Sequence, residues 1–232
     1  MISNIAQAGV KSHRDCKGGN MRSWPLSVCI GLSLVVTPVF PAASSGEKIN
    51  NPMVVVTEDT LAPGESEAIL SNRPSVIVPM SNGSAQFAAS GGRSQAQALR
   101  RGGVIFHGIG FTAIKNDGAL PLHFARIEFL TAGKQETWGN TGLTPSYKIL
   151  LDNRYARVYS IRIASQASEP QHTHHDRVVI VLAGAKLEHI LPNGKKEPVN
   201  LTTDEIAWHP AATHQGHNLG QTNFWAIIVE PK

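Results

Sequence analysis

Apolar and polar residues follow each other at short spacing from about residue 50 to the end of the 232-residue chain. Short runs rich in β-branched and aromatic residues recur, as in Tyr155–Ile163, Val178–Leu182 and Phe224–Val229. Turn residues bound these runs, and no stretch of helical length keeps an apolar residue every three to four positions. The pattern therefore predicts an all-β protein of short strands.

A hairpin is the clearest local prediction. Two alternating runs, Leu187–Leu191 and Lys195–Leu201, flank the turn sequence Pro192-Asn193-Gly194. Asn-Gly favours a tight turn between antiparallel strands. Many short strands separated by such turns indicate a sandwich or a barrel.

The chain matches itself weakly at a shift of 102 residues without a gap, placing residues 56–128 on 158–230. Only 11 of these 73 positions are identical, so the match rests on pattern. Ser66-Glu67 falls on Ser168-Glu169, and Val76–Val78 falls on the apolar run at 178–180. We interpret the chain as two homologous units, 46–132 and 150–232, joined by a linker at 133–149.

Residues 1–45 have the features of an export signal and leader. Met21-Arg22 begins a short basic region, Leu26–Val36 is mostly apolar, and Pro38–Ser45 offers small residues for cleavage after Ala43 or Ser45. Translation from Met1 or from Met21 stays open, as do an uncleaved anchor and acylation at Cys29. We expect a periplasmic or secreted protein with no stable membrane insertion after processing.

Composition excludes two classes of function. The net charge of +4 arises mostly in the leader, and the remaining chain holds 17 basic against 16 acidic residues. A near-neutral chain lacks the electrostatic basis for binding nucleic acid. Both cysteines, Cys16 and Cys29, lie in the leader, so the processed protein has neither a disulfide nor a cysteine nucleophile.

Histidines carry the candidate chemistry, and seven of the ten lie between positions 172 and 217. In an extended chain, residues i and i+2 point to the same face, so His172 and His174 can aim two imidazoles at one point. His214 follows after the hairpin and a Pro-containing turn, and it can supply a third. We expect His189, in the hairpin, to lie on the surface.

Here the sequence resembles the cupin superfamily, in the segments QHTHHDRVVIVLAG and HPAATHQGHN. The matching positions are His172, His174, Gly184, Pro210, His214 and Asn218. The resemblance implies two tandem cupin (jelly-roll) β-barrels and one divalent transition metal ion bound by His172, His174 and His214. It also implies a non-haem dioxygenase-like activity on a small organic substrate.

Two departures from the cupin pattern matter. Arg177 stands where cupins usually place a glutamate ligand, so either Asp176 becomes the fourth ligand or the site has three histidines only. Imidazoles do not distinguish Fe, Mn, Zn, Ni or Cu. Arg177 is either a salt-bridged strand residue or an anchor for a substrate anion. In the first unit Leu70, Asn72 and Thr112 stand at the positions of the three histidines, so we expect a degenerate barrel without metal ligands.

Two functions of different classes fit the sequence. The first is an exported metal-dependent enzyme with a small-molecule substrate, whose catalytic residues the sequence does not identify. The second is a non-catalytic binding module for a small anionic ligand. No nucleophile elbow, phosphate loop or nucleotide fingerprint is present in the sequence. Formation of a homo-oligomer stays open.

Overall fold

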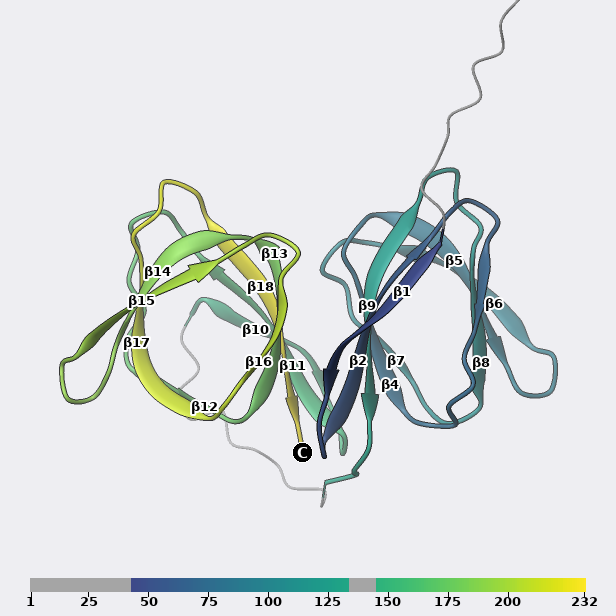
Figure 1. The fold of residues 1–232 in the computed structure, drawn as a ribbon, viewed down its shortest axis with the longest axis horizontal. Coiled ribbons are helices and arrows are strands. Elements are labelled where there is room, and N and C mark those ends of the chain that lie inside the picture. The colour runs from purple at the N-terminus through teal and green to yellow at the C-terminus, as the bar shows by residue number, and fades with distance from the viewer. Residues whose placement is uncertain (1–42, 134–144) are drawn as a thin grey trace, which may run out of the picture. The chain divides into compact units, whose positions relative to one another are not determined.

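The protein is described by a computed structural model over residues 43–133 and 145–232, and the regular structure in these ranges consists of strands (Figure 1). All pairings between these strands are antiparallel, and the strands form two barrels of two sheets each. The prediction of an all-β chain of two tandem jelly-roll barrels is confirmed.

The first barrel joins a five-stranded and a four-stranded sheet. The larger sheet has the order β1 (Ser44–Asn50), β2 (Val54–Leu61), β9 (Leu122–Phe129), β4 (Ser75–Pro79) and β7 (Ile105–His107). The smaller sheet has the order β3 (Ser66–Ala68), β8 (Phe111–Asn116), β5 (Gly83–Ala89) and β6 (Ser94–Leu99).

The second barrel repeats this topology strand for strand. Its larger sheet has the order β10 (Tyr147–Asp152), β11 (Ala156–Ile163), β18 (Phe224–Pro231), β13 (Arg177–Ala183) and β16 (Ile206–His209). Its smaller sheet has the order β12 (His172–His174), β17 (Ala212–Asn218), β14 (Ala185–Ile190) and β15 (Lys196–Leu201). Strands β11 and β18 lie 102 residues after β2 and β9, which is the shift found in the sequence.

Alternation along the strands of the larger sheets divides the buried apolar residues into three clusters. One fills the first barrel and includes Ile77 and Phe124, and another fills the second and includes Val179 and Ile228. The third draws on the opposite faces of both larger sheets, including Val56, Ile127, Val178, Ile180 and Val229. Because side chains at i and i+1 point to opposite faces, each central strand contributes to two cores.

Local details agree with the sequence in one place and correct it in another. The hairpin β14–β15 forms as predicted, and Gly194 in its turn has a φ of 79°, a conformation that glycine adopts without strain. The linker prediction of 133–149 runs too far, because strand β10 begins at Tyr147 and continues the larger sheet. Residues 134–144 of the linker lie outside the described residues.

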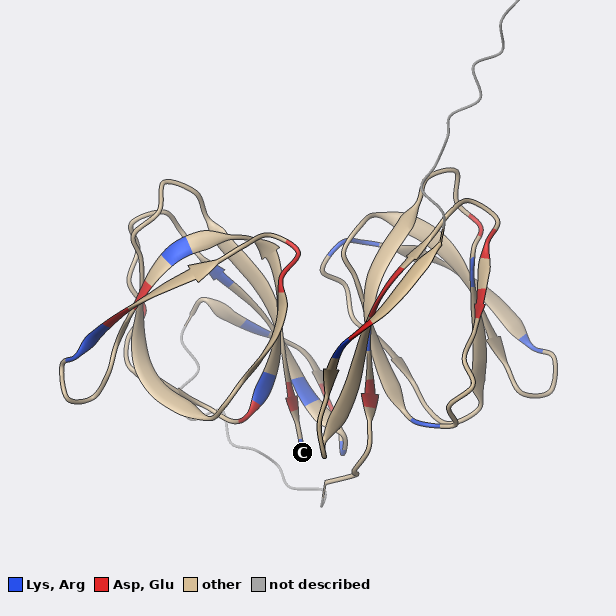
Figure 2. Ribbon diagram, viewed as in Figure 1, with Lys and Arg blue, Asp and Glu red and all other residues tan. Residues whose placement is uncertain are grey.

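Charges of both signs are distributed over both barrels (Figure 2). Among the described residues, no helix is long and apolar enough to cross a membrane. The predicted export signal falls almost wholly in residues 1–42, outside the described ranges, so it stays a prediction. The first described strand, β1, begins directly after the first of the two expected cleavage positions.

Candidate metal centre

Strand β12 places two imidazoles side by side in the second barrel. His172 and His174 are buried while Thr173 between them is exposed, as the alternation of a strand requires. His214, on the paired strand β17, lies directly opposite His172 in the register and is also buried. One ring nitrogen from each of the three lies within 4.8 Å of the others, so the cluster can hold one metal ion.

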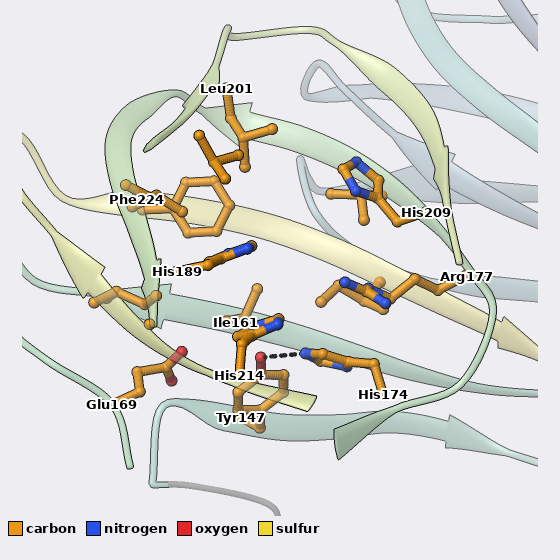
Figure 3. A pocket seen from close by; sticks show the side chains of 16 residues that line it. Tyr147, Ile161, Glu169, His174, Arg177, His189, Leu201, His209, His214 and Phe224 are labelled. Carbon is orange, nitrogen blue, oxygen red and sulfur yellow. Dashed lines mark hydrogen bonds between the residues drawn. The ribbon is translucent and has the colours of Figure 1, made fainter. Parts of the chain in front are cut away.

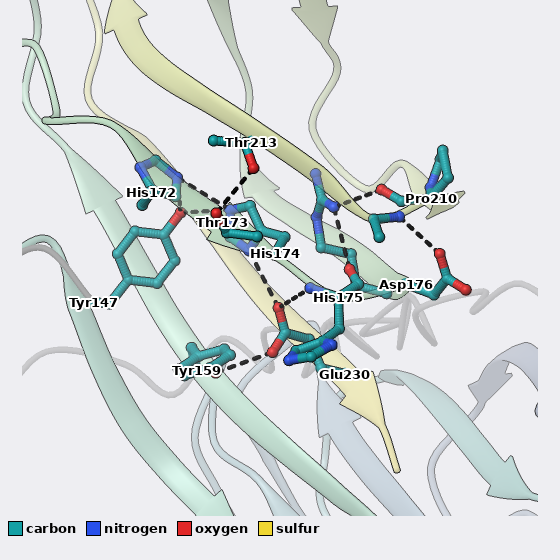
Figure 4. A network of polar contacts seen from close by, with 12 residues as sticks. Tyr147, Tyr159, His172, Thr173, His174, His175, Asp176, Pro210, Thr213 and Glu230 are labelled. Atoms are coloured by element: carbon teal, nitrogen blue, oxygen red, sulfur yellow. Dashed lines mark hydrogen bonds and ion pairs between the residues drawn. The ribbon is translucent and has the colours of Figure 1, made fainter. Parts of the chain in front are cut away.

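Neighbouring groups fix the orientation of two of these rings. The Nδ1 atom of His172 lies 2.9 Å from the carbonyl oxygen of Pro170, and Nδ1 of His174 lies 3.2 Å from Oε1 of Glu230. Each acceptor favours the tautomer with hydrogen on Nδ1, which leaves a lone pair on Nε2. The two Nε2 atoms then face each other at 3.1 Å (Figure 4).

Glu230, at the end of β18, holds His174 from behind. Its carboxylate is buried and also accepts hydrogen bonds from the Tyr159 hydroxyl at 3.0 Å and from the backbone N–H of His175 at 3.3 Å. A carboxylate behind a ligating histidine fixes the ring and strengthens its remaining nitrogen as a donor to metal. Burial lowers the pKa of His174 to about 4, and the hydrogen bond to Glu230 opposes this only in part. His174 is therefore neutral at physiological pH, as a metal ligand must be.

Tyr147, from strand β10, completes the polar end of the cluster. Its hydroxyl oxygen lies 3.1 Å from Nε2 of His172 and 3.0 Å from Nε2 of His174. Burial, followed by the negative charge of Glu169, raises the pKa of this phenol well above its ordinary value. Tyr147 is thus a neutral hydroxyl whose single hydrogen can be donated to either of the two nitrogens.

His189 corrects the expectation of a surface residue. It is half-buried in β14, and its ring stacks on that of His214 with 3.9 Å between centroids and 8° between planes. Burial lowers the pKa of His189 to about 4 and that of His214 to about 2. The stack holds the third imidazole in place, because packing against a flat ring restricts its rotation.

A cavity of about 50 Å³ opens beside the histidines inside the barrel (Figure 3). Arg177 and His209, neighbours in the β13–β16 register, form its polar wall with His189, while Phe224 and Leu201 are among its apolar lining. The guanidinium of Arg177 donates from Nη1 to the carbonyl oxygen of Pro210 at 2.9 Å. This bond holds a cationic group beside the candidate metal position.

Comparison with known proteins identifies the fold. No protein-family model matches the chain, and no curated protein matches it. Solved structures do: oxalate decarboxylase from Lactobacillus farciminis, in a formate complex, is 10% identical over 84% of this chain and 83% of its own, with a TM-score of 0.60. AerE from Microcystis aeruginosa is 16% identical over 82% and 98%, with a TM-score of 0.58.

A third neighbour is a cupin 2 conserved barrel domain protein from Leptotrichia buccalis, 16% identical over 85% of this chain and 92% of its own, with a TM-score of 0.54. The chain has the bicupin fold. At these identities the likeness extends to the fold alone.

The second barrel of this bicupin does not bring Asp176 into the cluster. Its Oδ1 accepts a hydrogen bond of 2.7 Å from the backbone N–H of Ala211, and the side chain points away from the histidines (Figure 4). Asp176 thereby fixes the turn that leads into β17. Among the described residues, the histidine, cysteine and carboxylate groups gathered closely enough for a metal are His172, His174 and His214.

The first barrel corrects the expected equivalence of Leu70, Asn72 and Thr112 with the three histidines. All three are exposed, and Leu70 is 95% accessible. A bulge in β8, where Ala89 pairs with Phe111, turns Thr112 outward and puts Phe111 at the inward position. Those side chains therefore face solvent rather than the barrel interior.

Sequence reasoning missed four residues that shape the centre: Tyr147, Glu169, His189 and Glu230. A signal existed for the two acids, because Glu169 and Glu230 are among the few identities in the 102-residue repeat, with Glu67 and Glu128. Both are at most 2% exposed, and such burial of a carboxylate is uncommon without a partner. No comparable signal marked Tyr147, which precedes its barrel's first predicted strand.

Proposed function

We propose that the second barrel binds one divalent transition metal ion through His172, His174 and His214 and acts on a small anionic organic substrate. The orientation of the imidazoles carries this proposal. With Nδ1 of His172 and His174 held by oxygen acceptors, their Nε2 lone pairs converge. Imidazole lone pairs that converge can bind a cation together, whereas they do not attract each other.

The cavity supports a small substrate. A volume of about 50 Å³ has room for only a few water molecules, at roughly 10–15 Å³ each. Arg177 in its wall is a group that binds carboxylates through parallel hydrogen bonds. One structural neighbour is named for oxalate, a two-carbon dicarboxylate, and was solved with formate. A substrate of a few carbon atoms with a carboxylate or enolate fits this wall.

A metal with three protein ligands keeps open positions, where it supplies Lewis-acid chemistry to a bound oxygen atom. For a dioxygenase-like reaction the co-reactant is O2. A carbon–carbon bond of the substrate breaks, each fragment receives one oxygen atom, and carbon supplies the four electrons that reduce O2. In this reaction Arg177 orients the anionic group, Glu230 holds His174, and the apolar lining restricts access of water.

Metal analysis tests the binding step. Protein prepared without a histidine tag should carry close to one equivalent of metal, and His172→Ala and His214→Ala should lose it while circular dichroism shows an intact fold. His123→Ala, in the first barrel, is the matched control and should keep the metal. Unchanged metal content in both folded barrel-two variants would refute the site.

Turnover separates the enzyme from the binding module. Iron- and manganese-loaded protein is offered small carboxylates and diketones, oxalate included, while O2 uptake and CO2 release are followed. Uptake of O2 with a substrate supports the dioxygenase-like assignment, and CO2 release without O2 consumption indicates decarboxylation. Calorimetric binding of a carboxylate that requires Arg177, without turnover, supports the binding module.

Export is part of the proposal and rests on the sequence of residues 1–45. N-terminal sequencing of periplasmic or secreted material should find a mature chain beginning between about Ala43 and Gly46. Recovery of soluble cytoplasmic protein that begins at Met1 or Met21 would contradict export.

A further inference from the structure

The hydroxyl oxygen of Tyr147 and the Nε2 atoms of His172 and His174 form a small triangle. The three distances among the hydroxyl oxygen, Nε2 of His172 and Nε2 of His174 are 3.1, 3.0 and 3.1 Å. Two ligand atoms that bind one ion at about 2.1 Å with a right angle between them lie about 3.0 Å apart. The phenol oxygen thus has the spacing of a ligand that shares an ion with both nitrogens.

The hydroxyl of Tyr147 and the two Nε2 atoms share fewer hydrogens than they need to satisfy every lone pair that faces a neighbour. Each histidine directs its Nδ1 hydrogen to another acceptor, so both Nε2 atoms are acceptors. The Tyr147 hydroxyl carries one hydrogen and can donate it to one of them. The other nitrogen then faces lone pairs of its neighbours, an arrangement that a cation relieves and that no further described side chain resolves.

We propose that Tyr147 is the fourth protein ligand of the metal, giving the second barrel a centre of three histidines and one tyrosine. The inference rests on the proposed metal site and assigns the coordination position for which the sequence offered Asp176. When the phenol binds, its O–H bond breaks, the oxygen donates an electron pair to the ion, and the proton leaves to solvent.

The position of Tyr147 in the repeat supports a dedicated role. The residue 102 positions earlier is Ser45, which pairs with Asp59 as Tyr147 pairs with Ile161. The Ser45 hydroxyl donates to the carboxylate of Asp59. Both barrels therefore place a hydroxyl at the same edge position, and only in the second does it meet imidazole nitrogens.

Ferric iron is the probe for this ligand, because phenolate bound to Fe(III) gives a charge-transfer band in visible light. The unaltered protein, loaded with one equivalent of iron and oxidised, should show the band. Resonance Raman spectra excited within it should show phenolate ring modes. Tyr147→Phe should lose the band and weaken the affinity for iron at least about tenfold. Loss of a group that only hydrogen-bonds a metal ligand already lowers metal affinity about 10–100-fold.

Tyr159→Phe is the matched control. Tyr159 is a buried tyrosine whose ring centroid lies 5.8 Å from that of Tyr147, and its hydroxyl donates to Glu230 and not to a histidine nitrogen. This variant should keep the charge-transfer band. A band that survives in folded Tyr147→Phe, or one that disappears in Tyr159→Phe alone, overturns the inference.

The outcomes also separate this inference from the proposed function. If one equivalent of iron binds and depends on His172 and His214, but no phenolate band or ring mode is seen, the metal site stands and Tyr147 is not a ligand. If the unaltered protein retains no iron, zinc or manganese, both proposals fail together. The Raman measurement uses the unaltered chain, so the test holds even if Tyr147→Phe does not fold.

Discussion

The two barrels share a pair of inward-facing acids, and they differ in the cation that those acids face. Glu67 and Glu128 in the first barrel occupy the positions of Glu169 and Glu230 in the second, 102 residues later. In the first barrel Arg126 donates to Glu128 and to Glu67, the latter at 3.3 Å, and lies 3.9 Å from Asp59. The second barrel has Ile228 and Ile161 in place of Arg126 and Asp59.

The difference shows how one fold is used for structure and for chemistry. A buried carboxylate needs a positive or hydrogen-donating partner. The first barrel supplies the guanidinium of Arg126, a cation that is part of the chain and cannot leave. The second offers Glu230 the Nδ1–H of His174 and directs the opposite side of the imidazole toward the proposed metal position.

A second contrast lies among the rings inside the barrels. Phe87, His107 and Phe111 pack together in the first barrel, and His107 stacks on Phe111 with 4.2 Å between centroids. The corresponding inward positions in the second barrel hold His189, His209 and His214. Replacing phenyl rings by imidazoles at two of three positions converts an aromatic filling into the polar wall of a cavity.

Removing the guanidinium should have the largest effect. Arg126→Met leaves the buried carboxylates of Asp59 and Glu128 without their cation, so we expect a loss of about 3–5 kcal/mol in the free energy of unfolding. Urea unfolding followed by circular dichroism measures it. Lys196→Met, which breaks an exposed ion pair with Glu188, should cost at most about 1 kcal/mol. Equal stabilities of the two variants would show that the acids need no cation.

The shared acids should differ in their effect on metal. Glu230→Gln removes the charged acceptor behind His174, so the metal affinity should fall about 10–100-fold. Competition with a chromophoric chelator gives the dissociation constant. Glu128→Gln, the same change in the first barrel, should leave that constant unaltered. A matching loss in both variants would mean that the effect acts through folding.

The aromatic filling should make stability depend on pH. Burial lowers the pKa of His107, so below about pH 6.5 the unfolded chain binds a proton that the folded chain does not. Stability is then full above pH 6.5 and falls as the pH drops, by at most about 1.4 kcal/mol per pH unit for this group. His107→Phe should flatten that slope in unfolding experiments between about pH 5 and 7.5. An unchanged slope would contradict the assignment.

Asp176 should matter least. Asp176→Asn keeps an oxygen that accepts from the Ala211 N–H, so unfolding free energy should change by less than about 1 kcal/mol. Metal content should equal that of the unaltered protein. A strong loss of metal from the folded variant would restore Asp176 as a ligand.

The limits of sequence prediction follow from which features are local. Alternation and the Asn-Gly turn are local, so the strands, the hairpin and the pairing of His172 with His174 could be predicted. A bulge such as that at Thr112 shifts the inward face by one residue and leaves little trace in sequence, so the equivalence of the two barrels at that strand was misjudged. Tyr147 enters the site across a sheet edge, 25 residues before His172, and no spacing rule connects them.

The third apolar cluster has a consequence for the history of the chain. The cluster joins Val178, Ile180 and Val229 with Val56 and Ile127. Each barrel therefore has an apolar outer face that the other barrel covers. A single barrel of this kind would expose that apolar face and would associate with a second copy through it. Pairing of identical copies would thus have come before fusion. Once the two copies were joined, one could place an arginine among its acids while the other kept the proposed metal site.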